Sequence, residues 1–323
     1  MKAIVQDRFG SADVLELREV PDPMVGDDEV LLSVRAAGCG PDVWHLMTGL
    51  PSFARLMPEF RREWKAPRGR DVAGVVEQVG AGVTELALGD QVMGIVDGSF
   101  AELVAGSAKK LVRKPERLSF EEAAALPISG LTALHAVRDV ADVKAGQRVL
   151  VTGAGGGVGT LAVQIAKAFG AHVTGVCSAG KAELVRSLGA DEVIDYTRED
   201  FTEGGRTWDA IVDTAGRRSL RSLRRALAPK GALAIVGGDG DGKVTGGFFR
   251  QILRAPVLSM FTGQRLRPVM PKESHEGLEA LARLIESGEV TPVVDRTFAL
   301  AEAAEAVRYL EEGHPAGKVV VQI

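Results

Sequence analysis

Three side chains that could do chemistry lie close together in the segment AAGCGPDVWHLMTG, residues 36–49: Cys39, Asp42 and His45. Thiolate, carboxylate and imidazole groups bind metal ions, and a carboxyl or imidazole group also transfers protons. A catalytic zinc site requires three protein ligands and an open fourth position, and a lone Cys–His pair does not make one. The segment alone therefore does not decide between a zinc site and a metal-free site.

A second segment of interest is rich in glycine. The stretch RVLVTGAGGGVG reads as a strand that ends in a turn, and apolar residues at helical spacing follow it from Val158 to Phe169. Glycines allow a tight turn in which main-chain N–H groups and the helix N-terminus bind a pyrophosphate. We predict a dinucleotide-binding turn, although alanine holds the first place of the G-x-G-x-x-G register. Its residues are Ala154, Gly156, Gly157, Val158 and Gly159.

The next strand indicates which dinucleotide binds. An NAD site places an acid about 20 residues after the glycines, where it binds the ribose hydroxyls. The strand HVTGVC has no acid at its end, and Ser178 and Lys181 follow it. These side chains suit the 2′-phosphate of NADPH, and Tyr196, with Arg198 nearby, is expected to close over the adenosine. The alternative for Lys181, Tyr196 and Arg198 is an ordinary solvated surface position.

Two domains are expected to position these residues. A chain of 323 residues is too long for one ordinary core, so two domains are expected. The first ~120 residues contain short β-rich runs punctuated by Gly and Asp, which is typical of a partly open β-barrel. From Ser119, strands and helices alternate, which indicates an α/β domain with a doubly wound parallel sheet. We predict domain segments of residues 1–121, 122–265 and 266–323.

Composition narrows the range of partners. The net charge of −4 favours neither nucleic acid nor an acidic membrane surface. The basic stretch Arg217–Arg225, RRSLRSLRR, is interpreted as the solvated face of a helix. No apolar run approaches the ~20 residues needed to span a bilayer. Two cysteines cannot form a disulfide framework, so a cytoplasmic protein is expected.

Taken in order, the motifs resemble a known family. They are the turn GRDVAGVVEQVGAGV, the helix AAALPISGLTALHA, the turn GAGGGVG and the strand AGKVVVQI. Together they are similar to the medium-chain dehydrogenase/reductase superfamily, in its quinone oxidoreductase-like, zinc-free branch, over essentially the whole chain. The resemblance implies a GroES-like catalytic domain that is interrupted by a Rossmann domain and completed by residues 266–323.

The resemblance bears on the metal hypothesis. Zinc members of the superfamily have one ligand where Cys39 stands and a second in a GHE turn, which here reads Gly69, Arg70 and Asp71. Their third ligand lies where this chain has Ile128. Arginine and isoleucine do not ligate zinc, and two cysteines cannot fill the family's four-cysteine structural site. We therefore expect no metal.

The family also implies further site residues. Thr132 would lie near the nicotinamide, the backbone at Gly237 and Gly238 would meet its carboxamide, and Lys318 matches a GK pair that often lies near the cofactor. Related enoyl reductases use a tyrosine of the first domain as proton donor, which this chain lacks. Solvent remains as a donor, as do three side chains, His45, Asp42 and Arg70. The pocket wall is expected to include residues whose alternative role is core packing: Cys39, Trp44, Phe53, Phe248 and Phe249.

These expectations lead to a functional hypothesis. Without a Lewis acid, hydride transfer suits a small-molecule substrate whose negative charge spreads over an enolate or a quinol. We predict an NADPH-dependent reductase of quinones or α,β-unsaturated carbonyl compounds. The alternatives are a metal-free carbonyl or alcohol oxidoreductase and a non-catalytic NADPH-binding sensor. A homodimer is also expected, because Pro256–Thr262 resembles the edge strand that joins two sheets in relatives.

Overall fold

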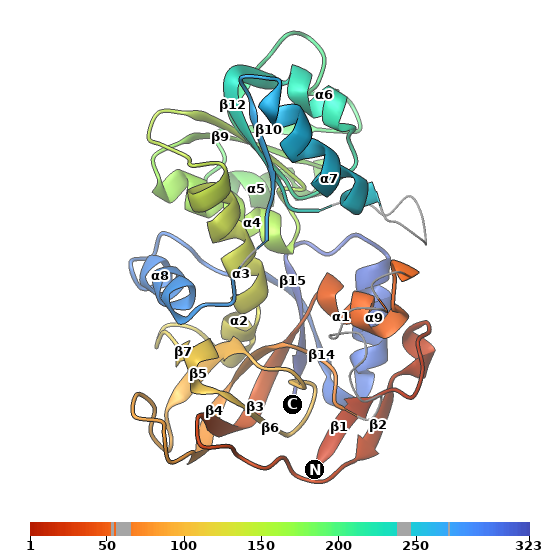
Figure 1. The fold of residues 1–323 in the computed structure, drawn as a ribbon, viewed down its shortest axis with the longest axis vertical. Coiled ribbons are helices and arrows are strands. Elements are labelled where there is room, and N and C mark those ends of the chain that lie inside the picture. The colour runs from red at the N-terminus through yellow and green to blue at the C-terminus, as the bar shows by residue number, and fades with distance from the viewer. Residues whose placement is uncertain (53–54, 56–65, 238–246, 271) are drawn as a thin grey trace. The chain divides into compact units, whose positions relative to one another are not determined.

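The chain folds into two compact units (Figure 1). The computed structural model describes residues 1–52, 55, 66–237, 247–270 and 272–323. The first unit consists of Met1–Ile128, Glu273–Glu286 and Pro292–Ile323, and the second of Ser129–Lys272 and Ser287–Thr291. The chain therefore leaves the first unit after Ile128, returns to it at Glu273, and adds the short segment Ser287–Thr291 to the second unit before it completes the first.

The first unit is built on a mixed β-sheet. Among the described residues its strands are β3 (Glu29–Cys39), β4 (Asp71–Val79), β5 (Gln91–Ile95), β6 (Leu103–Ser107), β7 (Leu111–Arg113), β14 (Val294–Ala299) and β15 (Lys318–Gln322). They lie in the order β14-β15-β3-β4-β5-β7, and β6 also pairs with β3. Only β14 and β15 pair in parallel. The strands β1 (Lys2–Val5) and β2 (Glu16–Glu19) pair separately. This GroES-like sheet is the predicted β-rich domain.

Local sequence signals explain where the helices begin. Ser119 and Glu122 form a capping box, in which Ser119 Oγ accepts from the Glu122 N–H and Glu122 Oε2 accepts from the Ser119 N–H, at 3.1 and 2.8 Å. This cap starts α2 (Phe120–Ala124), which α3 (Pro127–Leu134) and a π-helical segment (His135–Val140) follow. From Ser129 onwards these helical residues belong to the second unit, whereas α1 (Pro41–Thr48), α8 (His275–Glu286) and α9 (Ala303–Glu311) are helices of the first.

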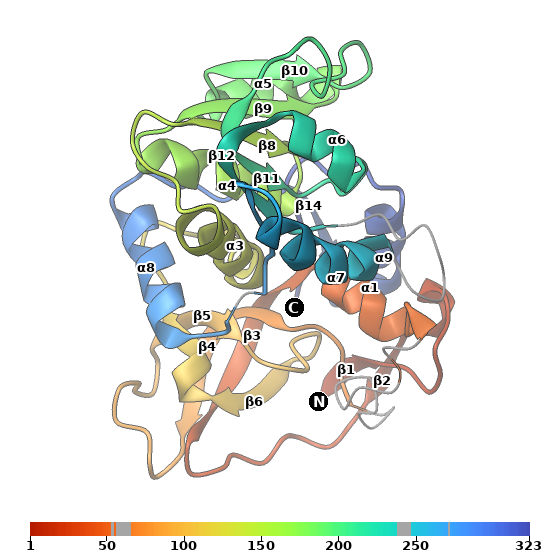
Figure 2. The same cartoon turned by 45° about the horizontal axis from the view of Figure 1, so that its top comes forward.

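The second unit is a parallel sheet of the Rossmann type (Figure 2). In the described chain its strands are β8 (Arg148–Thr152), β9 (His172–Cys177), β10 (Glu192–Asp195), β11 (Trp208–Asp213), β12 (Leu227–Ile235) and β13 (Arg265–Pro268). They lie in the order β10-β9-β8-β11-β12-β13. The intervening helices are α4 (Gly157–Ala168), α5 (Ala182–Ser187), α6 (Leu220–Arg225) and α7 (Gly247–Met260). All carboxyl ends of the strands meet at one edge of the sheet, which we call the carboxyl edge.

The prediction of an edge strand at Pro256–Thr262 is wrong. Pro256–Met260 forms the last part of α7, and the edge strands of the sheet are β10 and, after α7, β13. The apolar residues Leu253, Val257 and Met260 recur at helical spacing and are 73%, 54% and 80% exposed. A short apolar run fits both periods, so its sequence did not distinguish strand from helix.

Apolar side chains form separate cores in the two units. In the second unit, buried residues of the strands and helices surround Leu150, Ile211 and Leu233. In the first unit, one core gathers around Met47 and Phe100 and another around Leu32 and Val92. No helix in the described part of the chain combines the length and apolar character that crossing a membrane requires.

Candidate active site

The glycine-rich turn joins β8 to α4 at the carboxyl edge. Gly153 has a φ of +62°, in the left-handed region that favours glycine. A Cβ on Gly159 would lie 2.0 Å from the Gly153 carbonyl oxygen, so this close approach of helix and turn requires glycine. Gly156 is the N-cap of α4. The first N–H groups of a helix have no partner within it, so this end of α4 suits an anion.

The predicted cofactor-binding residues after β9 lie beside this turn. A Cβ on Gly155 would lie 2.6 Å from Lys181 Cδ, which places the Lys181 side chain directly against the glycines. Ser178 follows β9 and is half-buried. The Tyr196 N–H donates to the Cys177 carbonyl at 3.3 Å, so the exposed Tyr196 also starts from the carboxyl edge. The structure therefore brings Ser178, Lys181 and Tyr196 to one end of the sheet.

The sequence analysis missed a carboxylate at the same edge. Asp195 ends β10 and pairs with Cys177 in the sheet register. Its Oδ1 accepts from the Thr197 N–H and hydroxyl, and these bonds hold the pKa of Asp195 below its usual range. Its Oδ2 is buried without a hydrogen bond to any described residue, 3.6 Å from Arg198 Nε. The sequence feature that could have revealed Asp195 is that the third strand, EVID, ends in an acid, whereas the second strand, HVTGVC, does not.

Three more predicted residues belong to the second unit: Thr132, Gly237 and Gly238. A Cβ on Gly237 would lie 2.4 Å from the Thr214 carbonyl oxygen, so the backbone there also depends on glycine. Beside it, Asp213 is buried at the end of β11, accepts from Thr152 Oγ1 at 2.5 Å, and has its pKa raised by burial. Thr132 is buried in α3, and Gly238 lies outside the described residues.

In the first unit, Lys318 belongs to a buried charge cluster. Lys318 Nζ donates to Asp71 Oδ2 at 3.0 Å, and both side chains are at most 7% exposed. A Cβ on Gly40 would lie 2.6 Å from Asp42 Oδ1 and 3.4 Å from Lys318 Nζ, so Asp42 is near the same ammonium. Burial opposes the charge on Lys318, but Asp71 and Asp42 outweigh it and raise the pKa of Lys318.

Asp42 is the carboxyl group of this cluster most suited to hold a proton. It lies half-buried in the first turn of α1. Burial raises the pKa of Asp42, and the negative charge of Asp71 raises it further, against the opposing charges of Lys318 and Arg70. A carboxyl group with a raised pKa serves as a general acid nearer neutral pH.

His45 is exposed on the same helix. Its Nδ1–H donates to the Leu50 carbonyl oxygen at 2.8 Å, which leaves Nε2 as the nitrogen available to a ligand. The neighbouring Trp44 meets it edge to face, with ring centroids 5.0 Å apart. Trp44 is half-buried against the core, and its Nε1–H donates to Glu311 Oε1 at 2.7 Å.

Arg70 is held by two carboxylates. Its guanidinium donates to Asp97 at 3.0 Å and to Glu273, which also binds Lys110. Burial alone would lower the pKa of Arg70, but Glu273 and Asp97 raise it. An arginine in this setting keeps its charge and is a poor proton donor. Of the other predicted pocket residues, Phe53 and the side chains of Phe248 and Phe249 lie outside the described part.

The donor set at the position of the family's zinc ligands does not fit a metal. Cys39 is buried, and burial raises the pKa of its thiol to about 12, so the thiolate is disfavoured. Ile128 has no side-chain atom that could bind a metal, and its N–H donates to Asp71 Oδ1 at 2.7 Å. The Lys318 ammonium supplies the positive charge there. Within the described ranges, no three His, Cys, Asp or Glu side chains are grouped to hold a metal ion.

Two family descriptions match the chain. Residues 26–116 match the alcohol dehydrogenase GroES-like domain, and residues 188–321 match the family described as zinc-binding dehydrogenase. The second match does not include Cys39, Arg70 or Ile128. The name of that family therefore does not bear on the donor set described above.

Relatives align over nearly the whole chain. The chloroplast envelope quinone oxidoreductase homolog of Arabidopsis thaliana is 33% identical, over 97% of this chain and 95% of that protein. The mitochondrial NAD(P)H oxidoreductase RTN4IP1 of Mus musculus is 33% identical, over 100% of this chain and 89% of that protein.

Solved structures also match this chain over its whole length. The quinone oxidoreductase of Coxiella burnetii has a TM-score of 0.88 and 31% identity, covering 100% of this chain and 99% of that one. The Escherichia coli quinone oxidoreductase complexed with NADPH has a TM-score of 0.85 and 26% identity, and each chain is fully covered. This chain is therefore an NAD(P)H-dependent oxidoreductase of the medium-chain dehydrogenase/reductase superfamily and belongs to its quinone oxidoreductase-like branch.

Proposed function

We propose that this protein is an NADPH-dependent, zinc-independent reductase that transfers a hydride to a quinone or an α,β-unsaturated carbonyl compound. The observation that carries the choice of cofactor is the Lys181 side chain against Gly155, after a strand β9 that ends without an acid. An ammonium and the Ser178 hydroxyl suit a 2′-phosphate. The NADPH complex of the similar Escherichia coli enzyme supports the same choice.

The residues of the carboxyl edge have separate roles in holding the cofactor. The N–H groups at the start of α4 would bind the pyrophosphate, and Ser178 and Lys181 the 2′-phosphate. Tyr196 would cover the adenosine, and the backbone at Gly237 would meet the nicotinamide carboxamide. The bound cofactor supplies the hydride, and the protein supplies orientation and electrostatics.

The first unit offers two groups that handle a proton. Asp42 has a raised pKa and lies beside Lys318, and His45 has its Nε2 free of the Leu50 contact. We propose Asp42 as the donor to an enolate carbon and His45 as the alternative. A quinol takes its protons from solvent and needs no donor.

The choice of substrate class follows from the lack of a fitting metal donor set. Hydride addition to a conjugated acceptor spreads the negative charge and needs no Lewis acid, whereas alcohol oxidation benefits from one. Names of relatives support this choice. A 2-methylene-furan-3-one reductase of Solanum lycopersicum is 34% identical over 99% of this chain and 79% of that protein.

The test is NADPH consumption measured across quinones, enones, enoyl thioesters and aldehydes, with and without a chelator. We expect steady oxidation with a quinone or an enone, unaffected by the chelator, and elemental analysis should find well under one zinc per chain. Alcohol oxidation that the chelator abolishes would overturn the proposal. Tight NADPH binding without turnover of any acceptor would favour the non-catalytic sensor.

A further inference from the structure

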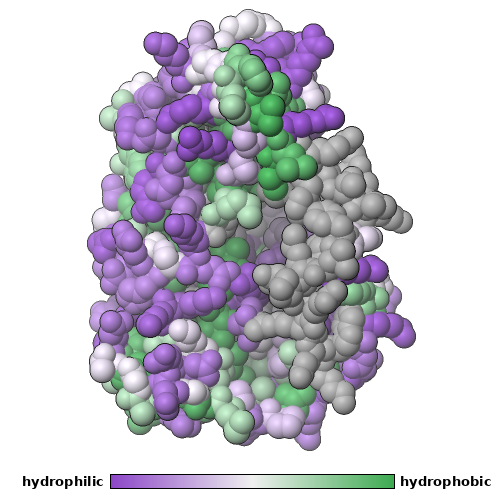
Figure 3. All heavy atoms as spheres, viewed as in Figure 1, coloured by the Kyte–Doolittle hydropathy of each residue, from purple (hydrophilic) through white to green (hydrophobic). Residues whose placement is uncertain are grey.

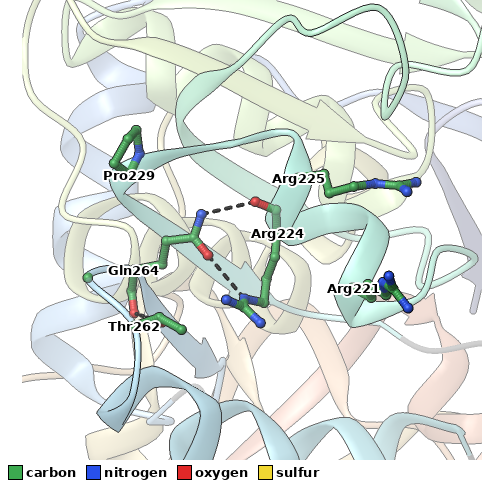
Figure 4. Close-up of a pocket in the computed structure, with 7 residues that line it drawn as sticks. Arg221, Arg224, Arg225, Pro229, Thr262 and Gln264 are labelled. Carbon is green, nitrogen blue, oxygen red and sulfur yellow. Dashed lines mark hydrogen bonds between the residues drawn. The ribbon is translucent and has the colours of Figure 1, made fainter.

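A pocket lined by arginines lies in the second unit (Figure 4). Its volume is about 300 Å³, at the lower end of the range for small-ligand sites. The wall is formed by the end of α6, the start of β12 and the turn that leads into β13. The lining residues are Arg221, Arg224, Arg225, Pro229, Thr262, Gly263 and Gln264.

Arg224 is fixed in this pocket by Gln264. Its Nε–H donates to Gln264 Oε1 at 3.1 Å, and Gln264 Nε2 donates back to the Arg224 carbonyl at 3.0 Å. The same amide lies 3.0 Å from the Leu227 carbonyl and 3.3 Å from that of Ala228. The Gln264 amide therefore binds carbonyls at the end of α6 and at the start of β12.

The pocket carries excess positive charge. None of its seven described lining residues is acidic. Arg221 is exposed and makes no hydrogen bond or ion pair with any described residue. Arg225 is exposed. Its positive charge helps to lower the pKa of Asp200, but the Asp200 carboxylate already forms an ion pair with Arg218 at 2.9 Å. Three arginines and no acidic residue among the lining residues give the pocket a positive charge that a bound anion would offset.

The turn that lines the pocket depends on a glycine, Gly263. A Cβ on Gly263 would lie 2.8 Å from the Pro229 carbonyl oxygen, so this turn passes β12 at a distance that a larger residue would disturb. Ser259 and Thr262 hydroxyls donate to the Gln264 carbonyl at 2.9 and 3.4 Å and hold the turn in place.

The pocket is distinct from the cofactor site. It lies where β12 and β13 begin, at Leu227 and Arg265, whereas the glycine turn follows the end of β8. In a parallel sheet these are opposite edges. Ligands of such sheets usually bind at the carboxyl edge, so this would be a second site.

We propose that this pocket binds a phosphate group of a small soluble anion. Guanidinium groups bind phosphate oxygens through paired, charge-assisted hydrogen bonds. Arg224 supplies a guanidinium that Gln264 already holds in place, and the exposed Arg221 and Arg225 side chains would turn towards the bound anion. The arginine-rich stretch 217–225 is therefore more than a solvated helix face.

The experiment is calorimetric titration of the whole protein with pyrophosphate, in the presence of saturating NADP⁺ to fill the cofactor site, and again without it. We expect one pyrophosphate per chain under the first condition. The double variant Arg221→Gln/Arg225→Gln should weaken binding at least tenfold, or about 1.4 kcal/mol. The control Arg148→Gln/Arg283→Gln removes two exposed arginines outside the pocket and should bind as the parent does.

Several results would overturn the proposal. Pyrophosphate binding that NADP⁺ abolishes belongs to the cofactor site, and binding that survives the double variant belongs elsewhere. Co-sedimentation with vesicles of phosphatidic acid and phosphatidylcholine, lost in the double variant, would assign the pocket to a lipid headgroup instead. If NADP⁺ does not bind, the proposed function fails, but arginine-dependent pyrophosphate binding would still support the pocket.

Discussion

Two carboxyl groups and one ammonium share the interior of the first unit. Asp71 and Lys318 pair directly, so the second carboxyl, Asp42, shares with Asp71 an ammonium that is already hydrogen-bonded, and burial and the charge of Asp71 still raise the pKa of Asp42. Partial burial and the neighbouring negative charge disfavour the ionised form of Asp42, and a proton removes that cost. The two predictions for Asp42 follow from this arrangement.

The first concerns stability. The pKa of Asp42 is raised in the folded protein, so stability falls as the pH rises above the usual aspartate range of about 3.9. Asp42→Asn removes this loss. Thermal unfolding should show the variant more stable than the parent at about pH 8, with a difference that shrinks towards about pH 4. The exposed Asp27→Asn is the control. A variant that is less stable at high pH would show that Lys318 holds Asp42 ionised.

The second concerns catalysis. If Asp42 protonates an enolate, Asp42→Asn should lower kcat for an enone by about 10²–10⁴-fold, the usual contribution of a general acid. Turnover of a quinone should change little, because solvent protonates the quinol. Steady-state kinetics with both substrates measure this. An equal loss for both substrates would indicate a structural effect, and a loss only in His45→Ala would transfer the role.

The prediction of a preference for NADPH over NADH depends on one residue, Lys181. A charged hydrogen bond contributes about 1.5–3 kcal/mol, so Lys181→Ala should raise KM for NADPH by about 10- to 100-fold, less where solvent screens it. KM for NADH should remain nearly unchanged, and added salt should reduce the NADPH preference more in the parent. Lys109→Ala, an exposed lysine of the other unit, is the control. Equal weakening of both cofactors would contradict the assignment and direct attention to Tyr196 and Arg198.

At the scale of elements, the glycine turn offers a matched pair of variants. Gly159→Ala places a Cβ 2.0 Å from the Gly153 carbonyl oxygen, whereas a Cβ on Gly156 has only one neighbour, at 3.4 Å. We expect Gly159→Ala to lose about 1–3 kcal/mol of stability, with weaker NADPH binding. Gly156→Ala should keep the parent's unfolding temperature. Similar unfolding temperatures for the two variants would show that α4 shifts away from the turn at little cost.

Short sequence motifs predicted most helices and strands. The site features that the sequence did not reveal depend on contacts between residues far apart in the chain. The capping box at Ser119 and the glycine turn lie within a few residues and are legible in sequence. Asp195 was missed because its place beside Cys177 depends on which strands pair. The contact of Lys318 with Asp71 spans 247 residues. No spacing rule reaches that far, so the sequence identified Lys318 only by family resemblance.

At the scale of the whole molecule, we propose that a second copy covers the exposed face of α7. Figure 3 shows hydrophobic side chains gathered over this helix. Leu253, Val257, Met260 and the following Phe261 are 54–80% exposed, and β13 beside them is an edge strand. Exposed apolar patches and open edges of this kind usually mark an interface. The proposed assembly is still the homodimer expected from the sequence, but its contact is made by α7 and β13 and not by a strand at Pro256–Thr262.

The oligomeric state tests this proposal. Light scattering should give twice the chain mass of 34.1 kDa for the parent at micromolar concentration. Phe261→Asp should shift the mass towards that of one chain without lowering the unfolding cooperativity. Leu88→Asp changes a similarly exposed residue, 73% accessible, in the first unit and should leave the mass unchanged. A monomeric parent, or a Phe261→Asp variant that remains dimeric, would contradict the proposal.

The path of the chain also sets the order of events during biosynthesis. β3 acquires one of its neighbours only when β15 (Lys318–Gln322) leaves the ribosome, long after β4 has been made. At translation rates of about 5–20 residues per second, that delay is on the order of 10–50 s. The second unit is synthesised without interruption, apart from Ser287–Thr291, and has time to fold first. During this interval the nascent first unit exposes an unfinished sheet edge and leaves Asp71 without the Lys318 ammonium that it pairs with in the folded protein.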